Sequence, residues 1–259
     1  MTNLQDKVII ITGSTQGLGK GFARHCAQLG AKIVISGRNV ERGQHVQAEI
    51  EALGTECLFV PAELSKPDQV QNIVAQCDAH FGRVDGLVNS AGLSTRSNID
   101  DTTVELWDYL FAVNVRAPFL LIQACVPIMR REGINGSVVN IQSVSGYGGQ
   151  ARLLAYSITK GALATLTKST ANALLFERVR VNGINLGWTH TDGEEVVQAK
   201  QEGQPLDWHE IAGKAMPTGR MMTPNDVAPL VAYLLSDASL MMSGANIDFA
   251  QNMVIGASD

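Results

Sequence analysis

The chain has 259 residues, of which 45% are hydrophobic and 17% are charged, and its formal net charge is −5. This length suffices for one large α/β domain with a sizeable core, and the composition excludes a disordered or fibrous protein. The basic residues are scattered singly or in pairs such as Arg130-Arg131, so the chain lacks the basic stripe that nucleic-acid binding requires. We therefore expect a globular protein with no nucleic-acid partner.

The sequence also argues against membranes, disulfides and metals. The first residues lack the basic and apolar layout of a signal peptide, and no apolar run approaches the length that crosses a bilayer. The cysteines are widely spaced and form no CxxC or Cys/His pattern. These features predict a cytoplasmic protein with reduced thiols and no membrane partner. No metal site is predicted, because the histidines are dispersed and lack ligand-spaced partners: His25, His45, His80, His190 and His209.

Short apolar runs bounded by turn residues alternate with helical patterns along the chain. The runs expected to form strands are residues 8–11, 33–35, 58–60, 86–88, 138–141 and 179–184. Helices are expected between them, among them one through residue 29, one over 40–53, one running to about 176 and one from about 224. The β-branched runs indicate strands covered on both faces, as in parallel sheets. The alternation predicts an α/β fold, a Rossmann-like doubly wound parallel sheet in a single domain over residues 1–259.

Residues 188–222 interrupt this rhythm. The stretch is rich in Glu, Gln, Gly and Lys and separates the last predicted strand from the last predicted helix. An excursion of this size on a compact domain is often a lid, so we expect a helical lid over the substrate. The alternative is a solvated surface loop.

The glycine-rich turn Thr12–Gly19 directly follows the first predicted strand and opens the first predicted helix. Glycine permits the tight turn and lets the backbone approach a pyrophosphate, which then lies at the helix N-terminus. The position of the turn after the first strand of an alternating pattern favours dinucleotide binding over a purely structural turn.

The end of the second predicted strand selects between the two nicotinamide cofactors. An acidic residue there would bind the ribose 2′-hydroxyl of NAD(H). The sequence instead reads Ser36-Gly37-Arg38, and a guanidinium pairs well with a phosphate. NADP(H) is therefore favoured, while NAD(H) stays open because Gln16 supplies no second positive charge. On this interpretation Gly37→Asp should move the preference toward NAD(H).

Tyr156 and Lys160 lie at positions i and i+4, on one face of a predicted helix. Moving a hydride to or from a carbinol carbon requires a proton to join or leave its oxygen. A free phenol, with a pKa of about 10, is a poor base at neutral pH, and a cation one helical turn away lowers that pKa. Ser143 follows the strand 138–141 and is placed to hold the substrate oxygen.

With these motifs the chain resembles the single-domain branch of the short-chain dehydrogenase/reductase family over nearly its whole length. The matching motifs, in chain order, are Thr12–Gly19, Asn89-Ser90-Ala91-Gly92, Asn114, Ser143, and Tyr156 with Lys160. The chain departs from the family pattern at three places, namely Ser90 for a second Asn, Leu186 for a Pro, and residues 247–252 without the common Asp-Gly-Gly.

The resemblance implies an NAD(P)-dependent oxidoreductase that interconverts a secondary alcohol and a ketone. Tyr156 would be the acid/base, Ser143 would position the substrate, and Lys160 would hold the nicotinamide ribose and tune Tyr156. Asn114 would anchor a water that relays protons to Lys160. A homotetramer, or a homodimer, is the implied assembly. The expected cofactor-binding residues are Gly13, Ser14, Thr15, Gln16, Gly17, Leu18, Gly19, Arg38, Glu63, Leu64, Asn89, Ala91, Gly92, Tyr156, Lys160, Gly187, Thr189 and Thr191.

The substrate is less closely defined than the reaction. The polar lid would suit a sugar, a polyol or another hydroxylated small molecule. Polar side chains expected around the pocket are Ser94, Thr95, Arg96, Gln150 and Arg152. A 3-oxoacyl thioester reductase is the alternative, in which Arg116, Arg130 and Arg131 would receive an acidic carrier protein. A second alternative, from a different functional class, is a non-catalytic protein that binds the nucleotide as a redox sensor or scaffold.

Overall fold

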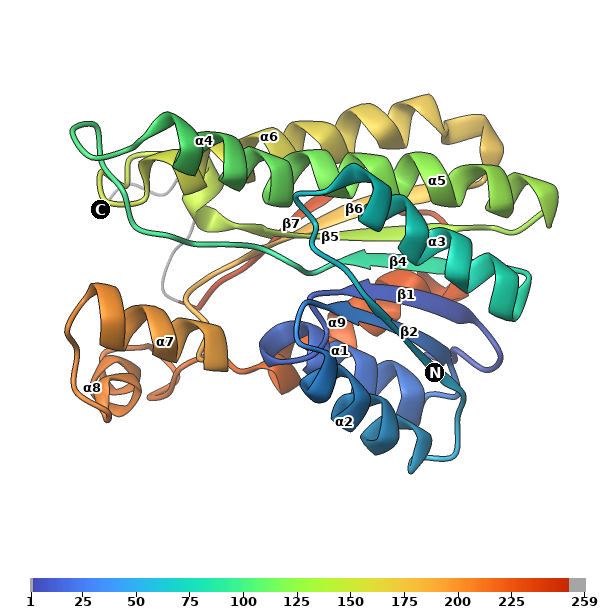
Figure 1. Cartoon of the computed structure of the whole chain (residues 1–259), viewed down its shortest axis with the longest axis horizontal. Helices are drawn as coiled ribbons and strands as arrows, with labels where there is room; N and C mark the ends of the chain where they lie inside the picture. Colours follow the sequence, from blue (N-terminus) through green and yellow to red (C-terminus); the bar gives the residue numbers. More distant parts are fainter. Residues whose placement is uncertain (1, 252–259) are drawn as a thin grey trace.

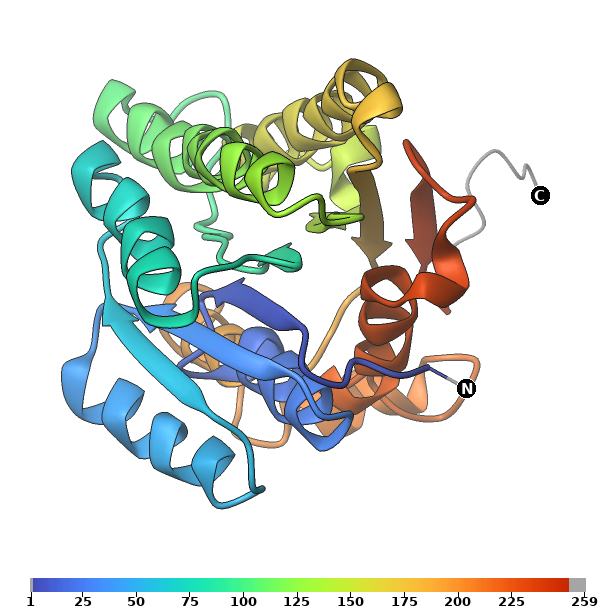
Figure 2. The same ribbon diagram turned by 90° about the vertical axis from the view of Figure 1, so that its right-hand side faces the viewer.

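A computed structural model describes residues 2–251 of the chain. Seven strands form one parallel sheet in the order β3-β2-β1-β4-β5-β6-β7. Helices cover both faces of the sheet (Figures 1 and 2), so the predicted doubly wound α/β fold is confirmed. The strands are β1 (Val8–Thr12), β2 (Lys32–Gly37), β3 (Cys57–Pro61), β4 (Gly86–Asn89), β5 (Ser137–Ser143), β6 (Arg180–Leu186) and β7 (Asn246–Phe249).

The side chains of β1 show why the strand has an unbroken apolar sequence. Ile9 and Ile11 belong to a buried cluster with three helices, while Val8 and Ile10 belong to a second cluster on the opposite face. Successive side chains of a strand point to opposite faces, so both faces must be apolar when both are covered. The helices of the first cluster are α1 (Gly17–Gln28), α2 (Val40–Glu51) and α9 (Pro224–Leu235), and those of the second include α3 (Pro67–Phe81), α5 (Ala117–Arg131) and α6 (Leu154–Ala173).

Several boundaries differ from the sequence expectations. Strand β7 was not expected, because its four residues are mostly half-buried and carry no continuous apolar run. Strand β6 continues two residues beyond the predicted end at 184, and helix α6 ends at Ala173 rather than about 176. The 3₁₀ turn Leu175–Glu177 follows it, since the last turn of a helix is often tightened in this way.

The longest helix corrects the expectation that no segment is long and apolar enough to cross a membrane. It runs without interruption through α4 (Val104–Phe111), the π-helical turn η1 (Ala112–Arg116) and α5, 28 residues in all. By length and composition it is the one membrane-spanning candidate among residues 2–251. Its apolar window is 56% buried, and α5 packs against α3 and β4, as expected of a core helix.

The excursion between β6 and α9 forms two short helices, α7 (Asp192–Gln201) and α8 (Trp208–Lys214). They lie beside the sheet's carboxyl edge, apart from the helices that cover its faces (Figure 1). The helical lid predicted for residues 188–222 thus has the expected secondary structure.

A buried polar network joins β5 to α6, the helix that carries Tyr156 and Lys160. The Thr167 hydroxyl accepts hydrogen bonds from the side-chain amides of Asn140 at 2.9 Å and Gln142 at 2.8 Å. It also donates to the Leu163 carbonyl at 2.9 Å, and the Thr167 side chain is fully buried. Because buried polar groups are costly to leave unpaired, these bonds define how α6 lies on the sheet.

Thr167→Val keeps the side-chain shape but removes the shared acceptor. Since a buried donor left unpaired costs about 1–3 kcal/mol, we expect a loss of that size in the free energy of unfolding, measured by urea denaturation. Thr170→Val is the control, because the Thr170 hydroxyl is only half-buried and donates to carbonyls of its own helix. Equal losses in the two variants would contradict the role given to the network.

Candidate active site

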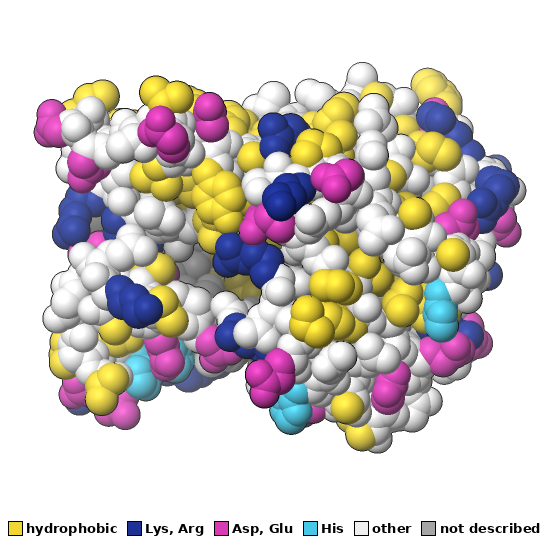
Figure 3. Space-filling view, viewed as in Figure 1, with side chains coloured by type: hydrophobic (Ala, Val, Ile, Leu, Met, Phe, Trp, Pro, Cys, Tyr) yellow, Lys and Arg dark blue, Asp and Glu magenta, His cyan; other side chains and the backbone are white. Residues whose placement is uncertain are grey.

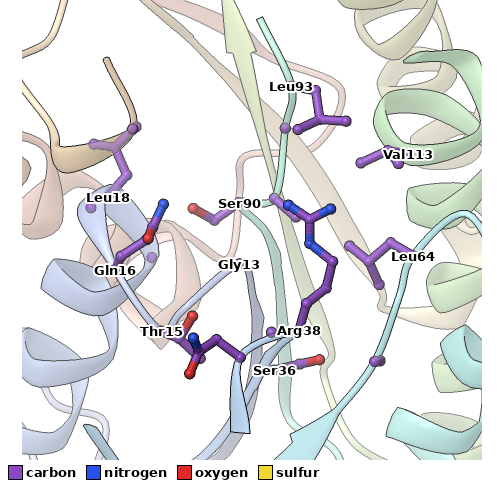
Figure 4. Close-up of a pocket in the computed structure, with 18 of the residues that line it drawn as sticks. Gly13, Thr15, Gln16, Leu18, Ser36, Arg38, Leu64, Ser90, Leu93 and Val113 are labelled. Carbon is purple, nitrogen blue, oxygen red and sulfur yellow. The ribbon is translucent and has the colours of Figure 1, made fainter. Parts of the chain in front are cut away.

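A cavity of about 360 Å³ opens at the carboxyl ends of β1, β2 and β4. The chain builds outward from β1 to β3 and resumes with β4 on the other side of β1, so the cavity lies where the strand order reverses. Ligands of doubly wound sheets bind at this place. Figure 4 shows the Arg38 side chain extending across the cavity from the end of β2. Of the residues expected to bind cofactor, the cavity is lined by Gly13, Thr15, Gln16, Gly17, Leu18, Gly19, Arg38, Glu63, Leu64, Ala91, Gly92 and Thr191.

The glycine turn needs its glycines for two physical reasons. Gly13 and Gly17 adopt φ angles of 63° and 54°, where side chains are strained. A Cβ on Gly13 would lie 2.7 Å from the Ala91 Cα, and one on Gly19 would lie 2.5 Å from the Gly13 carbonyl oxygen. The turn therefore closes directly on the loop after β4 and on helix α1, leaving bare backbone facing the cavity.

The N-terminus of α1 points free backbone donors at this cavity. Gln16 provides no side-chain cap, and the first turn of the helix contains no acidic residue. The Gly17 N–H donates to the Asp192 carboxylate of the lid at 3.2 Å. An uncapped helix N-terminus favours an anion, so a pyrophosphate fits this end of the cavity.

The far end of the cavity offers groups for a phosphate. The Ser36 hydroxyl is buried without a hydrogen-bond partner. The Arg38 guanidinium is anchored by Tyr109 at 3.1 Å and Glu63 at 3.4 Å and remains 62% exposed. Arg42 lines the cavity as a second cation, which the sequence analysis missed. Its spacing of four residues from Arg38, at the start of α2, was the available signal.

The substitution considered above for changing cofactor preference does not fit the fold. A Cβ on Gly37 would lie 2.7 Å from both the Cγ2 and the Oγ1 of Thr15. Gly37→Asp would therefore force the Thr15 side chain to shift as well as add a negative charge. Arg38 and Arg42 are the positions that change charge without this clash.

Two residues expected to bind cofactor lie behind the cavity instead. The Ser14 hydroxyl donates to the Ile11 carbonyl at 2.6 Å, and the Asn89 amide donates to Asn140 at 2.8 Å. Neither side chain lines the cavity. They hold the strand ends in place, whereas the buried Ser90 hydroxyl lines the cavity without a partner. The departure from the family motif at Ser90 thus leaves a free hydroxyl there.

Ser143, Tyr156 and Lys160 come together in a second cavity of about 680 Å³, which adjoins the first. Ser143 is the last residue of β5, and Tyr156 lies in the first turn of α6. The Ser143 hydroxyl hydrogen-bonds to the phenol and accepts from the Ser145 N–H at 3.1 Å. The Lys160 Nζ donates to the Ile141 carbonyl at 2.8 Å and lies 5.7 Å from the centre of the Tyr156 ring.

Burial dominates the electrostatics of these groups. It raises the pKa of Tyr156, while the Ser143 hydrogen bond and the Arg96 charge lower that pKa and the Glu194 charge raises it. Burial also lowers the pKa of Lys160 to about 8. Burial thus outweighs the neighbouring polar groups at Tyr156, and the expected lowering of its pKa by the Lys160 ammonium remains a prediction.

Asn114 lies in the π-helical turn η1, a distortion that is frequent at functional sites. Its side chain accepts from the Leu93 N–H at 2.9 Å and donates to the Leu93 carbonyl at 3.0 Å. It also donates to the Thr159 hydroxyl at 3.0 Å. The side chain thus ties the loop after β4 to α6, and a relay water held by this residue remains a prediction.

The segment after β6 borders the second cavity. Gly187 and Thr189 line it, and Thr191 lines both cavities and caps α7 by accepting from the Glu194 N–H. The Gly187 N–H donates to the Phe249 carbonyl at 3.0 Å. A Cβ on Gly187 would lie 2.9 Å from that of Ala250, so the unusual tail closes on this segment.

Tertiary structure brings together two of the histidines that are dispersed in sequence. His190 hydrogen-bonds to Glu195 at 2.8 Å, and its ring stacks on that of His209 with 4.2 Å between centroids and planes 4° apart. One ligand atom from each of His190, Glu195 and His209 lies within 4.8 Å of the other two, close enough to hold a metal ion. The expectation that the histidines lack partners for a metal therefore does not hold for this cluster.

Comparison with known proteins agrees with this architecture. A family model described as enoyl-(acyl carrier protein) reductase matches residues 13–250. An uncharacterized oxidoreductase of Thermotoga maritima is 34% identical, and the match covers 95% of this chain and 97% of that protein. Galactitol 2-dehydrogenase of Agrobacterium fabrum is 31% identical over 95% and 97% of the two chains.

The structural comparison extends over the whole chain. L-sorbose reductase of Gluconobacter frateurii, solved in complex with NADPH and L-sorbose, superposes with a TM-score of 0.91. It is 26% identical, and the match covers 99% of each chain. The sequence motifs, the sheet order and these matches lead to one assignment. The chain belongs to the short-chain dehydrogenase/reductase family of oxidoreductases.

Proposed function

We propose that this protein is an NADP(H)-dependent oxidoreductase that interconverts a secondary alcohol and a ketone in a sugar, a polyol or a related hydroxylated compound. The observation that carries the proposal is the convergence of Ser143, Tyr156 and Lys160 in a cavity that adjoins the cavity at the glycine turn. Relatives named for galactitol and L-sorbose support this substrate class.

In the proposed mechanism each side chain has a distinct task. A nicotinamide cofactor held by the glycine turn, Arg38 and Arg42 would supply the hydride-transfer chemistry. Tyr156 gives a proton to, or takes one from, the substrate oxygen, and Ser143 holds that oxygen against the phenol. Lys160 lies within reach of the same cavity, and its pKa of about 8 lets it exchange a proton near neutral pH.

NADP(H) is preferred over NAD(H) in this proposal. Arg38 and Arg42 supply two cations beside the unpartnered Ser36 hydroxyl, which together suit a ribose phosphate. The negative charge of Glu63 is offset by Arg38. The net charge of Arg38, Arg42 and Glu63 at the end of β2 is therefore positive.

The arginines considered for the acyl-thioester alternative already have partners within this protein. Arg130 pairs with Glu177 at 2.7 Å, and Arg131 pairs with Asp78 at 2.7 Å. Arg116 donates to the Ser65 carbonyl. Arginines already paired on the surface offer little attraction to an acidic carrier protein. The implied homotetramer and cytoplasmic location remain predictions.

The decisive test follows nicotinamide absorbance over a panel of ketoses, polyols, simple secondary alcohols and 3-oxoacyl thioesters. We expect turnover of the hydroxylated substrates to fall by roughly 10²-fold or more in Tyr156→Phe, while NADPH still binds. Tyr147→Phe is the control, because Tyr147 is exposed and does not line the cavity. Full activity in Tyr156→Phe would overturn the mechanism, and tight NADPH binding without any turnover would favour the sensor alternative.

Cofactor preference is tested by replacing both cavity arginines. Arg38→Gln with Arg42→Gln removes the charge-assisted hydrogen bonds to a 2′-phosphate, so we expect the Kd for NADPH to rise about 10- to 100-fold. The Kd for NADH should change far less. Arg24→Gln, on the exposed side of α1, is the control. An equal rise in the Kd for NADPH and for NADH would show that the two arginines do not bind the 2′-phosphate.

Asp192 provides a test of the pyrophosphate position. Its carboxylate occupies the Gly17 N–H at 3.2 Å, where a bound pyrophosphate would meet a like charge. Asp192→Asn should therefore lower the Kd for NADPH, by about two- to fivefold at low salt. Glu210→Gln, on the exposed face of α8, should leave the Kd unaltered. Weaker binding by Asp192→Asn would place the pyrophosphate elsewhere.

A further inference from the structure

An ion pair between Arg96 and Glu194 forms part of the wall of the substrate cavity. Arg96 comes from the loop after β4, and Glu194 comes from the first turn of α7 in the lid. The Arg96 Nη2 lies 2.8 Å from the Glu194 Oε1, and the two side chains are only 15% and 12% exposed. The face in Figure 3 is hollowed between the lid and the helices opposite it.

The Glu194 carboxylate is held in one orientation. Its Oε1 accepts hydrogen bonds from Arg96 at 2.8 Å, the Trp188 indole at 3.0 Å and the Gln198 amide at 2.7 Å. Within residues 2–251 no group donates to its Oε2. A rigid carboxylate with one free oxygen at a cavity wall is a preorganised acceptor for a hydroxyl group.

The pair is electrostatically close to the reacting atoms. The negative charge of Glu194 raises the pKa of Tyr156, and the positive charge of Arg96 lowers it. Both effects weaken with distance, and the surroundings are largely buried. Tyr156, Arg96 and Glu194 line the same cavity, so the ion pair is placed to meet the carbons next to a carbinol group held at Tyr156.

The wider cluster is electrically balanced. Glu202 pairs with Arg96 at 3.3 Å and with Arg152 at 2.9 Å, so two cations face two carboxylates. Apart from this pair, Lys160 is the one ionisable Lys, Arg, Asp or Glu among the described residues that line the cavity. Balanced charges with free donors and acceptors favour an uncharged, hydroxyl-rich ligand over a carboxylate or a phosphate.

We propose that Arg96 and Glu194 determine specificity by binding substrate hydroxyls beyond the reacting carbon. The Glu194 Oε2 accepts from one hydroxyl, and an unused N–H of the Arg96 guanidinium donates to a neighbouring oxygen. The preferred substrate is then an uncharged ketose or polyol with hydroxyls on adjacent carbons, rather than a simple secondary alcohol. This inference rests on the proposed function, which it extends to the substrate's remaining oxygens.

The test compares Glu194→Gln with the unaltered enzyme on two substrate classes. The probes are L-sorbose and galactitol as polyhydroxylated compounds, and cyclopentanone and cyclopentanol as monofunctional ones. A site built around a hydrogen bond to substrate loses discrimination when that bond is removed. We expect the ratio of kcat/KM for polyhydroxylated over monofunctional substrates to fall roughly 10- to 100-fold.

Two control variants separate recognition from closure of the lid. Glu202→Gln weakens contacts of Arg96 and Arg152 but leaves the Arg96–Glu194 pair and the Glu194 Oε2 in place, so the ratio should fall much less than in Glu194→Gln. Glu195→Gln changes the next residue on α7, which is half exposed and contacts His190 instead. Glu195→Gln should leave the ratio of kcat/KM for polyhydroxylated over monofunctional substrates unchanged.

The pH dependence of activity provides a further test, because a purely structural role of Arg96 and Glu194 would not change it. Removing the negative charge in Glu194→Gln lowers the pKa of Tyr156, so the pH midpoint of ketone reduction should move to lower pH. Arg96→Gln removes the opposing charge and should move the midpoint to higher pH. Opposite shifts support an electrostatic position beside the phenol.

The outcomes distinguish this inference from the function on which it rests. No Tyr156-dependent turnover on any member of either class would overturn the proposed function itself. An unchanged kcat/KM ratio in Glu194→Gln, whether activity is kept or falls equally on both substrate classes, would overturn only the specificity role. Shifts of the pH midpoint in the same direction for both variants would also overturn it.

Discussion

Parallel pairing of all seven strands places their carboxyl ends along one edge of the sheet, and every part of the candidate site depends on that edge. The glycine turn follows β1, Ser36 lies in β2, Ser90 follows β4 and Ser143 ends β5. Reversal of the strand order at β1 separates the loops there and leaves a crevice between them. The cavity at the glycine turn and the cavity around Tyr156 lie side by side because both open from this edge.

Burial is the second physical factor, and it acts on both proton-carrying side chains. It disfavours the phenolate of Tyr156 and the ammonium of Lys160, so neither charge is stable without polar partners. The Ser143 hydroxyl and the Ile141 carbonyl are the partners that the structure supplies. The site therefore depends on exact placement of α6 against β5, which the fully buried Thr167 network provides.

The lid joins the two cavities through charged residues. Asp192 reaches the N-terminus of α1, and Glu194, two residues later, reaches Arg96 above the substrate cavity. One helical turn of α7 thus contacts the place proposed for the pyrophosphate and the place proposed for the substrate. Helix α7 of the lid is therefore a structural element that both proposed ligands would contact.

The sequence by itself determined the fold class, because apolar runs for strands covered on both faces and intervening helical patterns have few other solutions. Spacing along one helix and position at a strand end are local properties, and they singled out Ser143, Tyr156 and Lys160, which the structure brings to one cavity. Their catalytic roles remain predictions. Strand β7 escaped prediction because its stability comes from pairing with β6 rather than from its own apolar pattern.

Only the tertiary structure decided which polar residues face the cavities. Asn89 donates a hydrogen bond to Asn140, whereas Arg42 lines the cavity at the glycine turn. Arg96 and Glu194 are 98 residues apart in sequence and form an ion pair only because the lid folds back over the loop after β4. Contacts between distant segments depend on how the loops fold back to the sheet edge. The local spacing of residues in the sequence does not indicate how they do so.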